Sequence, residues 1–185
     1  EIRLSLVGSE MCIRDRLVAD AVAAELDVVA RAVDVVSEAF RAGGRLIYVG
    51  AGTSGRLGVV DASEMPPTFG TQPDMVQGLI AGGREAMFRS QEGAEDREED
   101  GAEAISPLLK THDVVCGIAA SGRTPFVIGG MRYAHESGHK TIFVSTNHRD
   151  VVKAYAPFVD VLICAEVGPE AITGSTRMKS GTAQK

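Results

Sequence analysis

Four short segments of this sequence concentrate glycine, serine and threonine in a way that could bind an anion. They are residues 50–58 (GAGTSGRLG), 120–125 (ASGRTP), 145–147 (STN) and 173–182 (TGSTRMKSGT). Glycine lets backbone N–H groups point inward, the hydroxyls add donors, and the N-terminus of a following helix adds positive potential. One such segment could be an ordinary turn, because these residues are common in turns. Four of them together predict a phosphate-binding site.

Glu64 could act as a general acid. It is followed by Pro66-Pro67, which we expect to end a helix at Glu64. A carboxylate in that position would face the negative end of the helix dipole, which disfavours its charged form as a general acid requires. The alternative is a glutamate on a frayed, solvated helix end.

Glu95 lies in an acidic run, residues 92–103, which we expect to be helical. Two further glutamates, Glu92 and Glu99, would then lie within one turn of it, and like charges at that spacing disfavour ionisation. From the residues alone, a solvated acidic helix face is the favoured interpretation of this run.

Two motifs suggest cofactors that we do not expect. Residues 50–55 match the G-x-G-x-x-G pattern of dinucleotide-binding proteins, but the second predicted strand ends in residues 80–83 (IAGG) without the acid that would hold a ribose. Residues 135–139 (HESGH) match a zinc motif that needs both histidines on one unbroken helix. Gly138 should end that helix before His139. We therefore expect neither a nicotinamide cofactor nor a metal.

The elements that would position these residues alternate between helices and strands. Apolar residues spaced by three and four predict a helix over 17–42, which Gly43-Gly44 ends. Strands are expected at 45–50, 75–80, 113–119, 140–145 and 159–164, and further helices at 54–64, 84–105, 125–136 and about 150–154. This order predicts an α/β fold, a three-layer αβα sandwich with a five-stranded, mostly parallel sheet. The four segments would then meet at the carboxyl ends of the strands, where such folds bind ligands.

Composition excludes several other classes of protein. The chain has 185 residues and a net charge of −6, which argues against a nucleic-acid partner. No uncharged run approaches the roughly 18 residues that span a bilayer, so no membrane partner is expected. The three cysteines, Cys12, Cys116 and Cys164, lack metal-type spacing and suit a reducing cytoplasm, with Cys116 and Cys164 in the core. We expect one domain at 45–185, a preceding helix at 17–44, and a non-native or disordered arm at 1–16.

Longer stretches of the chain resemble a known family. They are residues 43–58, 61–70, 78–83, 92–96, 117–125 and 167–185. Together they resemble the N-acetylmuramic acid 6-phosphate etherases, members of the sugar isomerase (SIS) domain superfamily. The resemblance implies a doubly wound SIS domain and a carbon–oxygen lyase without a cofactor. Such a lyase cleaves the D-lactyl ether of N-acetylmuramic acid 6-phosphate to give N-acetylglucosamine 6-phosphate and D-lactate.

The resemblance also implies roles for particular residues. The matching catalytic residues are Glu64, as the acid, and Glu95, as the base. Phosphate and sugar hydroxyls would be held by Thr53, Ser54, Gly55, Ser121, Gly122 and Thr124. Arg177 and Lys179 would contact an anion or a dimer interface.

Further expectations concern assembly and an alternative function. SIS proteins commonly pair, so we expect a homodimer with sites near its interface. The family continues beyond the motif that ends at Lys185 into a helical region. The alternative functions are a non-catalytic sugar-phosphate-binding regulator of the same superfamily and, less favoured, an aldose–ketose isomerase of the same fold.

Overall fold

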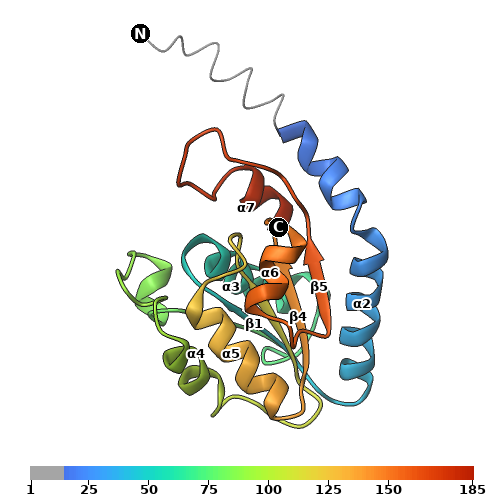
Figure 1. Cartoon of the computed structure of the whole chain (residues 1–185). Helices are drawn as coiled ribbons and strands as arrows, with labels where there is room; N and C mark the ends of the chain where they lie inside the picture. Colours follow the sequence, from blue (N-terminus) through green and yellow to red (C-terminus); the bar gives the residue numbers. More distant parts are fainter. Residues whose placement is uncertain (1–14) are drawn as a thin grey trace.

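The computed structural model describes residues 15–185 and is built on a five-stranded sheet (Figure 1). The strands are β1 (Leu46–Gly50), β2 (Val76–Ile80), β3 (Val114–Ile118), β4 (Lys140–Ser145) and β5 (Val161–Cys164). Their order is β2-β1-β3-β4-β5, and every neighbouring pair is parallel. Leu46 at the start of β1 lies opposite Val76 of β2 and Val114 of β3, so β1 occupies the interior of the sheet. The predicted parallel sheet is confirmed.

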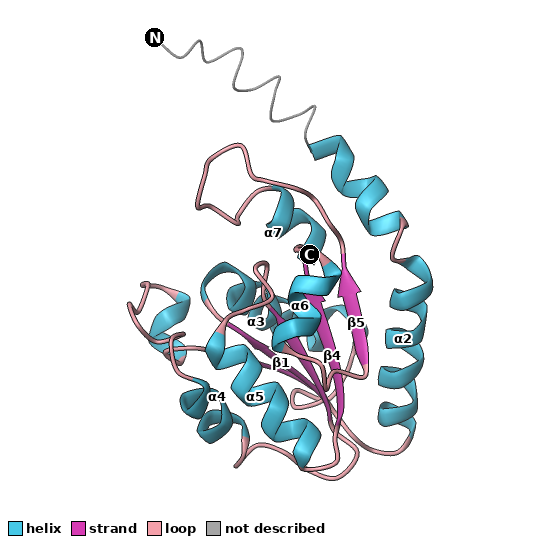
Figure 2. Ribbon diagram, viewed as in Figure 1, coloured by secondary structure: helices cyan, strands magenta, loops and turns pink. Residues whose placement is uncertain are grey.

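Helices cover both faces of this sheet (Figure 2). One face packs against α2 (Leu26–Arg41) and α3 (Gly52–Phe69), through buried residues such as Ala39 and Ala62. The other packs against α4 (Glu98–Ile105), α5 (Pro125–Glu136) and α6 (Arg149–Tyr155). The predicted three-layer sandwich is therefore confirmed.

Strand residues alternate between these two faces. Along β3, Val114 and Cys116 belong to the apolar cluster under α2 and α3, whereas Val115 belongs to the cluster under α5. All five residues of β3 are buried, which explains why the strand is a continuous apolar run. Cys116 and Cys164 are both free and buried, as predicted, while Cys12 lies outside the described residues.

The N-terminal helix differs from the prediction of one helix over 17–42. Residues 15–23 are helical, residues 24–25 form a turn, and α2 follows. Both carboxylate oxygens of Glu25 accept hydrogen bonds from Arg149 Nη2, at 2.7 and 2.6 Å, and Oε2 accepts a third from the backbone N–H of Cys164 at 3.1 Å. The turn thus joins the start of α2 to α6 and β5. The predicted arm at 1–16 lies outside the described residues except for its last two positions.

Helix α3 is longer than the predicted 54–64. It begins at Gly52 and continues through Pro66-Pro67 to Phe69. Each proline removes a backbone N–H donor, and its ring crowds the carbonyl four residues before it, so the last turns of α3 lack two backbone hydrogen bonds. Gly70 then ends the helix in a left-handed conformation at φ +68°, and its N–H donates to the carbonyl of Pro66 at 2.9 Å.

The predicted helix over 84–105 is also wrong. Residues Arg84–Met87 form a short 3-10 helix, turns follow, and α4 begins only at Glu98. Between these two elements only Ala94 packs against the core. A continuous helix there would bury too little apolar surface to offset the order it imposes.

A buried ion pair joins the amino ends of β1 and β3. The carboxylate of Asp113 accepts the backbone N–H and Nε of Arg45 at Oδ1, at 2.9 and 3.1 Å, and Arg45 Nη2 at Oδ2, at 2.6 Å. The backbone N–H of Lys110 adds a fourth bond at 2.8 Å. Side-chain exposure is 10% for Arg45 and 1% for Asp113, so solvent replaces neither partner.

A short helix not anticipated from the sequence, α7 (Lys179–Gln184), packs against α3. The carboxylate of Glu170 accepts the first two backbone N–H groups of α7, from Lys179 at 3.2 Å and Ser180 at 3.1 Å. This local cap explains how a segment rich in glycine and hydroxyls becomes helical. Within residues 15–185, none of the helices combines the length and the apolar character needed to cross a bilayer.

Candidate active site

The turns that follow β1 and β3 lie next to each other at the carboxyl edge of the sheet. Gly50, the last residue of β1, is opposite Ile118, the last residue of β3. From β1 the chain passes through α3 to β2 on one side, whereas β4 and β5 are added beyond β3 on the other. The connections therefore diverge between β1 and β3, which is where doubly wound sheets bind ligands.

The turn after β1 is closed tightly by two glycines. A Cβ on Gly50 would lie 2.6 Å from the Cα of Gly55, so the first turn of α3 packs directly on the end of the strand. Ser54 is buried, and its Oγ donates a hydrogen bond to Oε1 of Gln184 at 2.8 Å. The N–H of Gly55 donates to the carbonyl of Ala51. The anion donors of this turn are therefore the free N–H groups at the helix start and the half-buried Thr53.

The turn after β3 is joined to the turn after β4. Gly122 adopts φ +67°, a conformation that favours glycine. The hydroxyl of Ser121 accepts the N–H of Arg123 at 3.2 Å, and the carbonyl of Ser121 accepts Nδ2 of Asn147 at 2.9 Å. Thr124 precedes the first turn of α5, and its side chain makes no capping bond, so its hydroxyl is not committed to the helix.

The turns after β3 and β4 open into a hollow of about 520 Å³, which we call the hydroxyl-rich hollow. It is lined from three of the four predicted segments and includes the hydroxyls of Ser121, Thr146, Thr173, Ser175, Thr176 and Ser180. The predicted convergence is confirmed for these three segments, whereas residues 50–58 line the two other hollows described below. Arg177 is exposed, and Lys179 is buried beneath the surface with its Nζ donating to the carbonyl of Val167 at 2.5 Å.

Glu64 lines a second hollow, of about 330 Å³, which we call the Glu64 hollow. It is bounded by Tyr48, Leu57, Gly58, Val60, Asp61, Glu64, Ile118, Gln184 and Lys185. Because α3 continues to Phe69, Glu64 does not end a helix as predicted. The carboxylate of Asp61 instead accepts the hydroxyl of Tyr48 at 2.8 Å. Burial, together with nearby negative charge and this bond, raises the pKa of Tyr48 well above its usual range.

Glu95 lines a third hollow, of about 380 Å³, together with Gly52 and Arg56. Its side chain is exposed and lies in a turn, so the predicted helical stacking against Glu92 and Glu99 is wrong. The carbonyl of Glu95 accepts the N–H of Phe126 at 3.1 Å, which ties this turn to α5.

The two glutamates are therefore not brought into one cavity within the protomer. The third hollow touches α3 at Gly52 and Arg56, and the Glu64 hollow touches it at Leu57 and Asp61. These pairs lie on different faces of the helix.

One residue at this edge was not anticipated as a site residue. Gln184 occurs only as part of a motif in the sequence, yet it binds Ser54 and lines the Glu64 hollow. No local signal could have indicated this, because the two residues are 130 positions apart.

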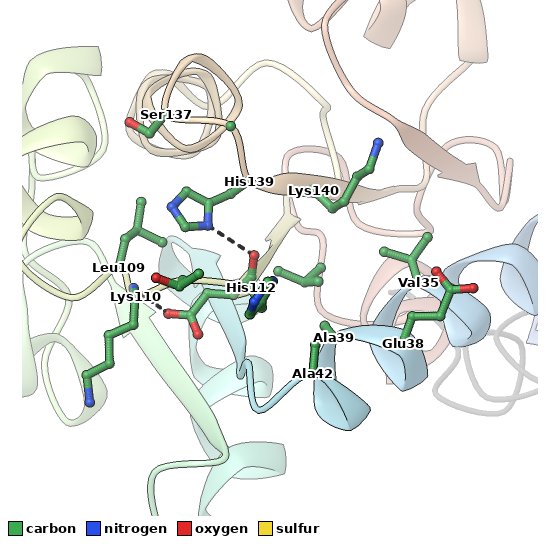
Figure 3. A pocket seen from close by; sticks show the side chains of 14 residues that line it. Val35, Glu38, Ala39, Ala42, Leu109, Lys110, His112, Ser137, His139 and Lys140 are labelled. Carbon is green, nitrogen blue, oxygen red and sulfur yellow. Dashed lines mark hydrogen bonds between the residues drawn. The ribbon is translucent and has the colours of Figure 1, made fainter.

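A further cavity, of about 690 Å³, lies at the opposite edge of the sheet (Figure 3). Residues from the amino ends of β3 and β4, including His112 and His139, line it together with α2. Two of its charged side chains are already paired, since Asp113 binds Arg45 and Lys140 binds Asp160 at 2.8 Å.

The zinc-like motif is broken as the sequence predicts. Helix α5 ends at Glu136, Gly138 adopts φ +85°, and His139 lies beyond it with Nδ1 3.2 Å from the carbonyl of Asp113. Across residues 15–185, we find no group of three or more His, Cys, Asp or Glu side chains placed to hold a metal ion.

Comparison with known proteins identifies the class of this chain. Residues 27–135 match the family model of the glucokinase regulatory protein N-terminal SIS domain, and the chain belongs to this family. Phosphoheptose isomerase from Neisseria gonorrhoeae has the same fold, with a TM-score of 0.70 and 16% identity over 97% of this chain and 91% of that chain.

Curated relatives with higher sequence identity to this chain are etherases. Over 173 residues the chain is 62% identical to N-acetylmuramic acid 6-phosphate etherase from Salinibacter ruber, covering 92% of this chain and 55% of that protein. The etherase from Symbiobacterium thermophilum is 57% identical over 172 residues, covering 93% of this chain and 56% of that protein. The predicted resemblance is confirmed, and the chain spans slightly more than half the length of these relatives.

Proposed function

We propose that this chain carries the sugar-phosphate site of an N-acetylmuramic acid 6-phosphate etherase, a lyase of peptidoglycan recycling. The products would be N-acetylglucosamine 6-phosphate and D-lactate. The observation that carries this proposal is the 62% identity to an etherase over 173 residues. Free, buried thiols at Cys116 and Cys164 suit a reducing compartment, and we place the reaction in the cytoplasm.

The proposed reaction is an elimination followed by addition of water. In the open-chain sugar, the C1 aldehyde acidifies the proton on C2. A base removes that proton, a C1=C2 enol forms and re-forms the carbonyl as the C3–O bond breaks, and an acid protonates the departing lactate oxygen. Water then adds its hydroxyl to C3 and a proton to C2, which completes N-acetylglucosamine 6-phosphate. The C3–O bond to lactate breaks and a C3–O bond to water forms, without an oxidant or a reductant, so two carboxylates that transfer protons can serve the reaction.

We assign the acid to Glu64 and the base to Glu95. The sugar phosphate would be held at the carboxyl edge by N–H and O–H donors of the turns after β1 and β3. The residues are Thr53, Ser54, Gly55, Ser121, Gly122 and Thr124. Ser54 would donate through its backbone N–H, because its hydroxyl is bonded to Gln184, and Gly55 would contribute the close packing that shapes the turn. The hydroxyl-rich hollow supports the assignment of Ser121, because its lining supplies further hydroxyl donors. It also contains Glu166 and Glu170, and the carboxylate of Glu170 is already bonded to the first N–H groups of α7.

A homodimer would complete the site. Glu64 and Glu95 line separate hollows on different faces of α3, so one sugar needs a second copy to bring both carboxylates to it. We assign the base in each site to Glu95 of the partner subunit.

The activity is tested by incubating the chain with N-acetylmuramic acid 6-phosphate and measuring D-lactate. Glu64→Gln should reduce turnover by roughly 10²- to 10⁴-fold while leaving phosphate binding intact. Glu85→Gln, an exposed glutamate outside the three hollows, is the matched control and should retain activity. Turnover that survives in Glu64→Gln would remove Glu64 from the acid role.

Mixing two inactive variants tests the shared site. If each site takes Glu64 from one copy and Glu95 from the other, random exchange between Glu64→Gln and Glu95→Gln chains makes half of the dimers mixed. Each mixed dimer has one intact site of two, so about a quarter of wild-type activity should return. A mixture that stays inactive, although a mass measurement shows exchange, would place both carboxylates on the same copy.

The second candidate is a sugar-phosphate-binding regulator. The match of residues 27–135 to a glucokinase regulatory protein domain favours it. A regulator would bind the sugar phosphate without releasing D-lactate, so the same incubation separates the two functions.

A further inference from the structure

The turn after β3 is held from the side of β4 through its backbone carbonyls. The carbonyl of Ala120 accepts three hydrogen bonds from the end of β4 and the turn after it, from Ser145 Oγ at 3.1 Å, from Thr146 Oγ1 at 3.3 Å and from the N–H of Thr146 at 3.2 Å. Both donor residues are buried, with exposed fractions of 0% for Ser145 and 8% for Thr146. Water therefore does not replace these bonds, and the direction of the Ala120 carbonyl is fixed.

Asn147 fixes the next peptide of the same turn. Its Nδ2 donates to the carbonyl of Ser121 at 2.9 Å, and its Oδ1 accepts the N–H of His148 at 2.8 Å. The second bond identifies the donor end of the amide, because only Oδ1 can accept an N–H. Gly122 lies so close to α6 that a Cβ on it would be 2.5 Å from Cγ2 of the buried Val152. The turn therefore cannot shift toward α6 without displacing a core side chain.

The direction of the Ala120 carbonyl decides where the N–H of Ser121 points. In a planar trans peptide, the carbonyl of one residue and the N–H of the next residue point in opposite directions. Because the Ala120 carbonyl points toward β4, the N–H of Ser121 points toward the other neighbour of β3, which is β1. The turn after β1 is the other half of the proposed phosphate site, so this N–H faces the region between the two halves.

The hydroxyl of Ser121 is oriented by the same turn. Its Oγ accepts the N–H of Arg123 at 3.2 Å, which leaves the hydroxyl hydrogen free to be donated. Ser121 is half-buried and lines the hydroxyl-rich hollow, so its hydroxyl can meet a ligand. One residue can thus offer an anion both an O–H and an N–H donor, and bonds within the protein set the direction of each.

We propose that Asn147 is a positioning residue for the phosphate group of the substrate. Its amide holds the carbonyl of Ser121, while the two hydroxyls from the end of β4 hold that of Ala120. The N–H and the hydroxyl of Ser121 thereby point toward the phosphate before it binds. Donors that are already in place bind an anion without the cost of ordering the turn. This inference rests on the proposed function and deepens it.

Calorimetry with N-acetylglucosamine 6-phosphate, the proposed product, tests this role. Asn147→Ala removes the donor to Ser121 without adding charge, and binding should weaken roughly 5- to 30-fold. Asn147→Ser should weaken binding to a similar extent. Its hydroxyl can still accept the N–H of His148 at the start of α6, but it is too short to reach the carbonyl of Ser121. Thr141→Val is the matched control, because it removes a hydrogen bond to Asp160 at the opposite end of β4 and should change binding less than about twofold.

A second measurement follows the N–H of Ser121 itself. In the wild-type protein, the amide proton of Ser121 should move downfield in a proton–nitrogen NMR spectrum when the sugar phosphate binds, because it then donates to an anion. In Asn147→Ala at saturating ligand, this shift should be lost or strongly reduced. A general loss of stability would leave the shift of the folded, ligand-bound molecules unchanged, so this signal separates a positioning role from a structural defect.

Three results would overturn the proposal. The first is binding by Asn147→Ala that is no weaker than binding by Thr141→Val. The second is recovery of wild-type binding in Asn147→Ser, which would place the effect at the start of α6. The third is an equal shift of the Ser121 amide proton in the wild-type protein and in Asn147→Ala.

The two proposals can fail separately. If the wild-type chain binds N-acetylglucosamine 6-phosphate but releases no D-lactate from N-acetylmuramic acid 6-phosphate, the etherase function fails while the variants still decide the role of Asn147. If the wild-type chain releases D-lactate and the Asn147 variants bind as it does, the positioning role alone fails. If the wild-type chain binds neither sugar phosphate, both proposals fail.

Discussion

The strongest test of the fold is removal of the carboxylate at Asp113, which joins the amino ends of β1 and β3. Asp113→Ala eliminates four hydrogen bonds, three from Arg45 and one from the N–H of Lys110. The guanidinium of Arg45, whose side chain is 10% exposed, then retains only the carbonyl of Leu108 at 2.5 Å. An uncompensated buried charge of this kind costs about 3–5 kcal/mol.

Thermal unfolding followed by circular dichroism measures this loss. A domain of this size loses roughly 2–4 °C in Tm per kcal/mol, so Tm should fall by roughly 6–20 °C. Adding Arg45→Met to Asp113→Ala removes the unpaired charge, so the double variant should be more stable than Asp113→Ala alone. A loss of stability below about 1 kcal/mol for Asp113→Ala would refute this reasoning. So would a double variant whose loss equals the sum of the losses in Asp113→Ala and Arg45→Met.

Two further predictions concern titratable groups. Burial raises the pKa of Asp160, but hydrogen bonds from Lys140 and Thr141 outweigh it, so the pKa lies below its usual value. A lowered pKa stabilises the fold above the unfolded-state value near ~3.9, and this stability is lost as the pH falls through the folded-state value. Asp160→Asn should therefore lower stability by about 1 kcal/mol at pH 7 and by nothing near pH 2, and an equal gap at both values would contradict the shift. Burial raises the pKa of Cys116 to about 12 and that of Cys164 to about 11, so on a Cys12→Ser background a thiol reagent at pH 8 should react only as fast as the chain unfolds.

Much of the fold could be predicted because strands that are buried on both faces consist of continuous apolar residues. The prediction for α5 and β4 coincides with the structure, since Pro125 suits the first turn of a helix and Gly138 suits the break before the strand. The end of α3 could not be predicted from Pro66-Pro67, because the packing of α3 against β1 and β2 overrides the helix-breaking tendency of proline. The turns around Glu95 could not be predicted either, because packing rather than charge decides the conformation of that segment.

The site was predictable in outline and not in detail. The hydroxyl segments could be placed at one edge because the carboxyl ends of parallel strands share that edge. The separation of Glu64 from Glu95 depends on which face of α3 each hollow touches, and this requires the actual bounds of the helix. The hydrogen bond between Ser54 and Gln184 depends on the docking of α7 against α3, and no periodicity in the sequence predicts that contact.

The bond between Ser54 and Gln184 has a consequence for how the protein is made. The two residues are 130 positions apart, and ribosomes add roughly 5–20 residues per second, so Gln184 is synthesised roughly 7–26 s after Ser54. A nascent chain can form β1 and α3 in that interval, but the Ser54 hydroxyl then faces water. In a growing chain the contact between α7 and α3 would therefore form late in translation, well after the residues of the first strand are synthesised.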